Sequence, residues 1–196
     1  MEFKVKKSEL LRELGAVQSA VERKTTLPIL SNILLEAKDG ALSISATDLD
    51  ISLRTTCPAS IVSDGTMTVP ALKFIDHLKL LQDDVHITLA ENHWLHVKSG
   101  RSKTKMIGMA PKNFPKLPEL PAKMIQIPIP EMQTLIRKIA FSISNEESRY
   151  ILNGALFVIK PDGLLIVATD GHRLGHCVCT KPIAVADGEM KVLLPI

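Results

Sequence analysis

Short runs of alternating apolar and polar residues cover most of the chain, and a helical period interrupts them in a few places. Leu10, Leu14, Val17 and Val21 follow a 4-3-4 spacing, which places them on one face of a helix. This helix would follow a strand around Phe3–Val5, with Ser8 as its N-cap. A second helix is predicted over Ala71–Leu81. Strands are predicted to end at 67–70 and to span 85–90, 93–100 and 102–109. The pattern favours an α+β fold.

The chain also repeats itself. Residues 29–50 (ILSNILLEAKDGALSISATDLD) align without a gap with residues 151–172 (ILNGALFVIKPDGLLIVATDGH), 122 positions later. Each copy contains an Asp-Gly pair, one residue out of phase, between two strand-like runs, and this is a hairpin signal. Upstream, Phe3 and Val5 match Ile125 and Ile127, which predicts a second strand. The apolar helix positions match at Met132, Ile136, Ile139 and Ile143, and Pro130 would lie in the first turn of that helix.

The repeat divides the chain into residues 1–122, a complete unit, and 123–196, the N-terminal half of a second unit. A proline-rich stretch at 111–123 would link them. The second copy ends at VLLPI, which matches the strand before Pro70, so its second helix and last strands are missing. We therefore expect an uncovered apolar face, an unpaired sheet edge, and a chain that is a piece of a longer protein.

Composition narrows the functional class. The chain is 45% hydrophobic and carries a net charge of +3, which is too little for a strong whole-protein grip on nucleic acid. Only seven aromatic residues are present (five Phe, one Trp, one Tyr), which argues against a base-stacking platform. Cys57, Cys177 and Cys179 show no disulfide spacing. Because neither a signal peptide nor an apolar run of membrane-spanning length is visible, a cytoplasmic protein is predicted.

Several of these motifs together resemble one family. They are the Thr-Leu-Pro-Ile-Leu run at 26–30, Thr-Asp-Leu-Asp at 47–50, Val-Pro-Ala-x-Lys-Phe at 69–74, Ser-Gly-Arg at 99–101, Phe-Pro at 114–115, Arg-Tyr-Ile-Leu-Asn-Gly at 149–154 and Ala-Thr-Asp-Gly-His-Arg-Leu at 168–174. In this order, over the whole chain, they resemble the bacterial DNA polymerase III β subunit, the sliding clamp.

The resemblance implies three similar domains per subunit, each with two helices on a curved antiparallel sheet. Two subunits would form a homodimeric ring around duplex DNA. Such a ring tethers the polymerase without catalysis and without a cofactor or metal, and it binds DNA independently of sequence. By family length, this chain would hold domain one and half of domain two but not domain three, so it could not close the normal ring.

The resemblance also implies two sets of site residues. In the family the helices line the hole, so cations near them would contact phosphates. The candidates are the cations Arg23, Lys24, Lys73, Arg137 and Arg149 and the neutral Tyr150 beside the last, with Arg12 and Lys138 as further possibilities. Many relatives carry Gln where this chain has Glu146, whose carboxylate would repel phosphate.

The second set would form a pocket for linear motifs of the polymerase catalytic subunit, the clamp loader and other partners. It comprises Leu152, Thr169, Gly171, His172, Arg173 and Leu174. The two leucines would supply apolar walls, Gly171 a close backbone approach, and the remaining residues a polar rim.

Alternatives remain open from the residues themselves. The cationic residues could be an ordinary solvated surface, and Thr-Asp-Gly could serve only as a turn. Asp170, His172 and His176 could hold a metal in an enzyme, although no second cluster supports this. The chain could also be a truncated module that self-associates or binds partners through residues 190–196 or an uncovered interface, without clamp activity.

Overall fold

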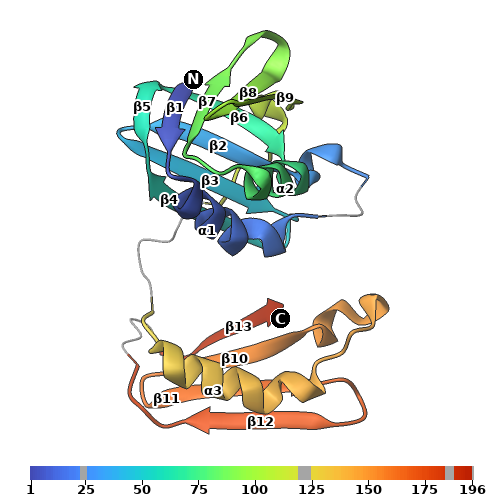
Figure 1. The fold of residues 1–196 in the computed structure, drawn as a ribbon. Helices are drawn as coiled ribbons and strands as arrows, with labels where there is room; N and C mark the ends of the chain where they lie inside the picture. The colour runs from blue at the N-terminus through green and yellow to red at the C-terminus, as the bar shows by residue number, and fades with distance from the viewer. Residues whose placement is uncertain (23–25, 119–124, 184–187, 196) are drawn as a thin grey trace. The chain divides into compact units, whose positions relative to one another are not determined.

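The chain forms two compact units, Met1–Glu119 and Leu120–Ile196, called unit 1 and unit 2 below (Figure 1). The computed structural model describes residues 1–22, 26–118, 125–183 and 188–195. All pairings between its strands are antiparallel, and helices pack on the sheets of both units. The fold is α+β, as predicted.

Unit 1 contains two sheets and two α-helices. Its elements are β1 (Glu2–Val5), α1 (Lys7–Val17), β2 (Asn32–Lys38), β3 (Ala41–Thr47), β4 (Ser52–Pro58), β5 (Ser60–Ser63), β6 (Gly65–Pro70), α2 (Ala71–Leu80), β7 (Val85–Leu89), β8 (Trp94–Ser99) and β9 (Ser102–Ile107). The sheets have the orders β4-β3-β2-β6 and β5-β1-β7-β8-β9. The predicted helices and strands are confirmed to within a few residues, and β5 is an addition.

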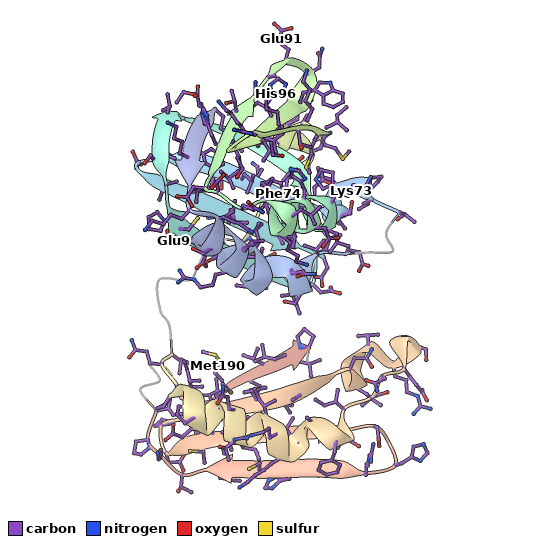
Figure 2. All side chains as sticks on the ribbon, in the orientation of Figure 1. Glu9, Lys73, Phe74, Glu91, His96 and Met190 are labelled. Carbon is purple, nitrogen blue, oxygen red and sulfur yellow. The ribbon has the colours of Figure 1, made fainter. Side chains whose placement is uncertain are left out.

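The helices of unit 1 complete its core. Leu10 and Leu14 of α1 and Phe74 of α2 are fully buried, together with apolar residues from both sheets. Burying such side chains contributes about 1.5–3 kcal/mol each. The adjacent Lys73 is exposed, so α2 presents one apolar and one polar face (Figure 2).

The start of α1 differs from the prediction. Ser8 lies inside the helix, because the helix begins at Lys7 and Lys6 is its N-cap without a side-chain hydrogen bond. The backbone N–H of Lys7 instead donates to Asp84 Oδ1 at 3.3 Å. The acceptor for this helix end is therefore a residue that follows α2 in the sequence, and a local capping pattern does not reveal it.

Unit 2 contains α3 (Ile129–Ile139), β10 (Gly154–Lys160), β11 (Gly163–Thr169), β12 (Leu174–Cys179) and β13 (Met190–Pro195). Pro130 lies in the first turn of α3, as predicted. The sheet order β12-β11-β10-β13 matches β4-β3-β2-β6.

The register of the two sheets confirms the repeat. Lys38 pairs with Ala41 in unit 1, and Lys160 pairs with Gly163 in unit 2, each 122 positions further on. The outer pair follows the same rule, since Thr47–Ser52 corresponds to Thr169–Leu174. The fourth strand also keeps its place: Pro70 lies opposite Asn32, and Pro195 lies opposite Gly154.

The predicted strand at Ile125–Ile127 is wrong, because these residues have no strand structure. In unit 1 the corresponding strand, β1, is held between β5 and β7. Neither neighbour has a counterpart among the described residues of unit 2. Ile125 and Ile127 nevertheless pack against the core of unit 2, as their apolar pattern requires.

The hairpin turns explain the one-residue phase difference of the Asp-Gly pairs. In unit 1, Asp39 (φ 51°) and Gly40 (φ 76°) form the two-residue turn, as predicted. In unit 2 the turn residues are Pro161 and Asp162, and Gly163 already begins β11. A Cβ on Gly163 would lie 2.2 Å from the carbonyl oxygen of Cys179, so this glycine is required for close strand packing and not for the turn.

Unit 2 exposes apolar surface that unit 1 buries, which confirms the expected uncovered face. Leu10 and Leu14 are fully buried, whereas their counterparts Met132 and Ile136 are half-buried. On the fourth strand, Val69 is 0% exposed and Leu194, in the equivalent register position, is 40% exposed. The expected open edge is not special to unit 2, because β6 and β13 are both terminal strands of their sheets.

Candidate functional site

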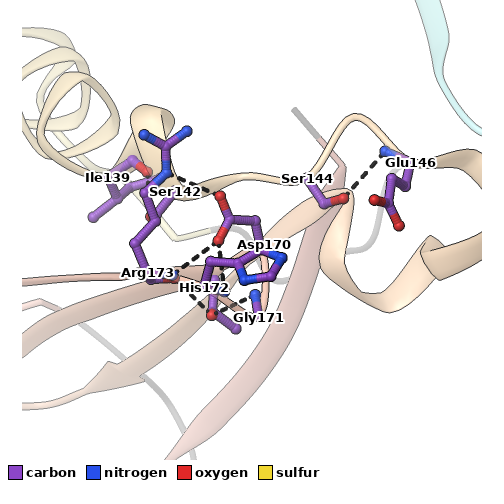
Figure 3. Close-up of polar contacts among 9 residues, drawn as sticks. Ile139, Ser142, Ser144, Glu146, Asp170, Gly171, His172 and Arg173 are labelled. Carbon is purple, nitrogen blue, oxygen red and sulfur yellow. Dashed lines mark hydrogen bonds and ion pairs between the residues drawn. The ribbon is translucent and has the colours of Figure 1, made fainter.

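The turn between β11 and β12 is closed by two side chains (Figure 3). The hydroxyl of Thr169 donates to the carbonyl of Arg173 at 2.8 Å and accepts the N–H of Gly171 at 3.1 Å. Asp170 Oδ1 accepts the N–H groups of His172 and Arg173 at 3.0 and 2.9 Å. Since four polar contacts fix five consecutive residues, the turn presents Gly171, His172 and Arg173 to solvent in a defined conformation.

Arg173 is held from two sides. Its Nε donates to Asp170 Oδ2 at 2.9 Å, and its guanidinium lies over the ring of Phe141, 5.6 Å from the centroid. The pKa of Asp170 falls to about 2, chiefly because its carboxylate accepts the backbone N–H groups of Arg173 and His172. Asp170 therefore stays ionised over the physiological pH range.

Gly171 has φ +89°, a conformation that favours glycine. A Cβ at this position would also lie 3.3 Å from Arg149 Nη1. Arg149 thus reaches the turn from the segment before β10, although the two are separate in sequence.

Unit 1 contains the same turn with different side chains. Leu49 N–H donates to Thr47 Oγ1 at 3.1 Å, and Asp48 Oδ1 accepts the N–H groups of Asp50 and Ile51 at 3.0 and 2.6 Å. Leu49 occupies the position of Gly171 with φ 83°. Thr-Asp is therefore a structural pair in both units. The three residues that follow it differ, because unit 2 has Gly171, His172 and Arg173 where unit 1 has Leu49, Asp50 and Ile51.

An open concavity of about 340 Å³ lies beside the turn, lined by Ser148, Arg149, Tyr150, Ile151 and Leu152. Ile151 is 59% exposed, and Leu174 on β12 is 61% exposed. Of the predicted pocket residues, only Leu152 belongs to the concavity lining, and Thr169–Leu174 lie in and after the turn. Arg149 connects the two groups, because it lines the concavity and its Nη1 faces Gly171.

The predicted phosphate-contacting residues lie on helices and connecting segments. Lys73 and Arg137 are exposed on α2 and α3, and Tyr150 is 76% exposed. Arg149 Nε is paired with Glu146 at 3.2 Å, so the carboxylate expected to repel phosphate also neutralises the nearest cation. Arg23 and Lys24 lie outside the described residues.

Two comparisons with sequence families cover nearly the whole chain. Residues 1–118 match the N-terminal domain of the DNA polymerase III beta subunit, and residues 126–196 match its central domain. The chain belongs to the DNA polymerase III beta subunit family.

Relatives within this family support the assignment. The chain is 37% identical over 199 residues to the beta sliding clamp of Vibrio cholerae and 34% identical over 198 residues to that of Haemophilus influenzae. It covers 54% of each relative, so it spans about half the length of the curated relatives that it matches.

Solved structures agree with the sequence comparison. The DNA polymerase III subunit beta of Pseudomonas aeruginosa superimposes with a TM-score of 0.91 at 35% identity, and the sliding clamp of Bacillus subtilis with 0.93 at 29%. The whole chain is covered in both, against 54% of each solved chain. Both units therefore have the clamp-domain fold of this beta subunit family.

Two residues that shape the site are not among the site residues predicted from the sequence. The sequence indicates Asp170 as a turn residue or a metal ligand and not as a member of the pocket, whereas in the structure it fixes the turn and binds the Arg173 side chain. Phe141 had no sequence signal, because it meets Arg173 only after α3 has packed on the sheet.

Within the described ranges, no group of three or more His, Cys, Asp or Glu side chains could hold a metal ion. The carboxylate of Asp170 is instead engaged by the turn and by Arg173. Of the helices in the described part of the chain, none is long and apolar enough to cross a membrane.

Proposed function

We propose that this chain supplies domain one and the N-terminal half of domain two of a cytoplasmic sliding clamp, a non-catalytic ring that encircles duplex DNA and tethers a replicative polymerase. The observation that carries the proposal is the repeated sheet, with the same register 122 residues apart, in a chain of the beta subunit family. A ring of repeated units holds DNA by enclosure, so it needs neither a cofactor nor base-specific contacts.

The proposed DNA contacts are weak and independent of sequence. A net charge of +3 and exposed cations on α2 and α3 favour phosphate attraction that salt reduces. The residues are Arg23, Lys24, Lys73, Arg137, Arg149 and Tyr150. Glu146 pairs with Arg149, which reduces what this cation contributes to phosphate attraction.

The proposed partner site takes a linear peptide motif from the polymerase, the clamp loader or another protein. Exposed Leu174 and the concavity at Leu152 offer apolar contacts, and the turn places the Gly171 backbone with His172 and Arg173 beside them. Apolar walls with a few fixed polar groups are typical of peptide-binding sites. Because residues beyond this chain would complete the site, full affinity needs the longer protein.

A topological experiment tests the clamp proposal. The full-length protein that contains this chain would be loaded on nicked circular DNA by a clamp loader and its retention measured by gel filtration, before and after linearisation of the DNA. A ring held by enclosure stays on the circle in high salt and leaves linear DNA by sliding off the ends. The 196-residue chain alone is expected not to be retained on either form.

Retention that is equal on circular and linear DNA would contradict enclosure. A double variant, Lys73→Gln with Arg137→Gln, tests the phosphate contacts, and Lys38→Gln is the matched control on the β2–β3 hairpin. The double variant is expected to lower loading and its salt dependence, because two phosphate contacts are lost, and the control is expected to behave as the parent.

Self-association is a second candidate function for the chain by itself. Leu194 is 40% exposed and Met190 41%, on a strand whose unit 1 counterpart has a buried core face. Contact with another copy would cover this surface. Sedimentation velocity over a range of concentrations tests it, and a monomer at the highest concentration would count against it.

A further inference from the structure

The two four-stranded sheets have a matched outer face, the side away from the core helices. Cross-strand partners share a face, so printed register pairs define rows across the sheet. In unit 2 the two complete rows are Val178–Leu165–Val158–Lys191 and His176–Val167–Leu156–Leu193, called the outer array below. In unit 1 the equivalent rows are Thr56–Ser43–Glu36–Thr66 and Arg54–Ser45–Leu34–Thr68.

These backbone positions are polar in unit 1 except at Leu34, and apolar in unit 2 except at Lys191 and His176. Within the polar rows of unit 1, Arg54 Nε donates to Ser45 Oγ at 3.2 Å. The outer array does not belong to the core of unit 2, which consists of the alternate residues of the same strands. Val178 is 53% exposed on this surface, and Leu156 is 38% exposed. Leu193 is 43% exposed and Leu165 and Val167 are half-buried, whereas Val158 is only 6% exposed. Exposed apolar residues grouped in this way are typical of an interaction site.

Unit 1 shows how far the chain itself covers such a face. There, Phe114 and Leu117 of the proline-rich segment pack with Leu34, the counterpart of Leu156. On the same face Ser45, the counterpart of Val167, is 0% exposed, whereas Ser43 and Thr56, the counterparts of Leu165 and Val178, are half-buried and exposed, respectively. A repeat of this covering in unit 2 would hide Leu156 and Val167 and leave Val178 and Leu165 open, while Val158 is already only 6% exposed.

The charges on the outer array favour one occupant. Its two polar members, Lys191 and His176, are both basic, and it contains no carboxylate. Lys191 shares its acidic partner, Glu189, with Lys160, so positive charge remains at that corner. In a symmetric pairing of two copies these basic groups would meet no acid across the interface. An acidic partner satisfies them.

The packing on the opposite face of this sheet favours a helix as the occupant. The other face of the same sheet is covered by α3, whose apolar stripe includes Leu135 and Ile139 and packs on β11 and β12. The array also continues into the proposed peptide pocket, because Leu174 and Thr169 form the next register pair along β12 and β11.

We propose that the outer array binds an amphipathic helix of a partner protein, apolar along one stripe and acidic along its flanks. The partner is expected to dock in the peptide pocket as well, and this expectation rests on the proposed function. The binding chemistry of the outer array is independent of the proposed function.

The test uses the 196-residue chain and a labelled synthetic peptide of 18 residues, with leucines at helical 3-4 spacing and glutamates on the flanks. Fluorescence anisotropy measures its binding to the parent chain, to Val178→Glu and to Val62→Glu. Val62 is a matched control, since it is a valine 63% exposed on a strand of unit 1. A scrambled peptide of the same composition tests for the stripe.

We expect saturable binding that Val178→Glu weakens at least tenfold and Val62→Glu leaves unchanged. The milder Val178→Thr, which keeps the β-branched shape, should weaken binding about threefold and guards against a folding defect. Equal binding of the scrambled peptide, or no binding, would overturn the proposal. A dimer of the parent chain in sedimentation that Val178→Glu dissociates would also overturn it, because the occupant would then be a second copy. None of these variants touches the peptide pocket or the phosphate-contacting residues, so failure here is distinct from failure of the clamp proposal.

Discussion

Units 1 and 2 use one sheet architecture in two environments. Their strands pair in the same register, yet Leu14 is fully buried while Ile136, its counterpart, is half-buried. The difference arises because α2 and the sheet containing β7 close the core of unit 1, and no described residue does so in unit 2. Strand pairing is therefore a property of each repeated segment, whereas full burial depends on elements that are further along the chain.

The turns sharpen the same comparison. Both use a Thr-Asp pair to bind the following N–H groups, and both place the next residue at positive φ. Unit 2 has glycine there and unit 1 has leucine, 58% exposed. The turn geometry is thus fixed by the hydrogen bonds. A residue other than glycine at that position, such as Leu49, adopts the positive φ at a cost in folding free energy.

The largest expected effect comes from truncating the matched core positions. Leu14→Ala should destabilise unit 1 by about 3 kcal/mol, because it leaves a cavity in a closed core. Ile136→Ala should cost unit 2 about 1 kcal/mol, since its site is already partly open to water. Calorimetric unfolding of both variants measures the difference, and equal losses would refute the contrast in burial.

Exchanging the residues at positive φ should have smaller and opposite effects. Gly171→Leu should cost about 1–2 kcal/mol, because a side chain is strained there and its Cβ would approach Arg149. Leu49→Gly should add about 0.5 kcal/mol, since relief of strain exceeds the added freedom of the unfolded chain. Chemical denaturation of each variant provides the measurement. A stabilising Gly171→Leu would show that the turn is not held as described.

The Asp170 carboxylate should make unit 2 sensitive to acid. Because its folded pKa is depressed to about 2 from 3.8, its stabilising contribution is complete above pH 3.8 and is lost as the pH falls through about 2. Melting temperatures of the parent and Asp170→Asn should therefore differ most above pH 4 and converge near pH 2. Asp162→Asn, in the neighbouring hairpin turn, serves as the control, and the same pH profile for both variants would contradict the assignment.

The thiols of Cys57 and Cys179 should differ in their rate of alkylation, and this prediction involves no change in the stability of the protein. Cys57 and Cys179 occupy equivalent positions, but Cys57 is 2% exposed and burial raises its pKa from 9.0 to about 11. Its thiolate fraction at neutral pH is then about a hundredfold lower than in the unfolded chain. Alkylation followed by mass spectrometry should label half-buried Cys179 well before Cys57. The reverse order would break the comparison.

Sequence reasoning succeeded where the deciding contacts are local. The Asp39-Gly40 hairpin, the helix from Ala71 and the proline in the first turn of α3 all depend on neighbouring residues. It failed where the partner is distant. Alternation at Ile125 and Ile127 indicated a strand, but a strand needs neighbours that this part of the chain does not provide.

The candidate site follows the same division. The role of Thr169 and Asp170 as a turn was foreseeable from the repeated Thr-Asp pair. The approach of Arg149 to Gly171 and the stacking of Arg173 on Phe141 were not, because both depend on how α3 and the following segment pack on the sheet. Which side chains face a partner is thus a property of tertiary packing.

The apolar outer array also bears on how unit 2 folds. Sliding one strand past its neighbour by a single residue exchanges the inward and outward side chains. In unit 1 such a slip would push Ser43 and Ser45 into the core, so the pattern itself enforces the correct alignment. In unit 2 both sides of β10 and β11 are apolar, and a slipped sheet would lose little burial. The close fit at Gly163 and the hydrogen bonds of the Asp170 turn both favour the correct alignment there, because a slip by one residue would disrupt them.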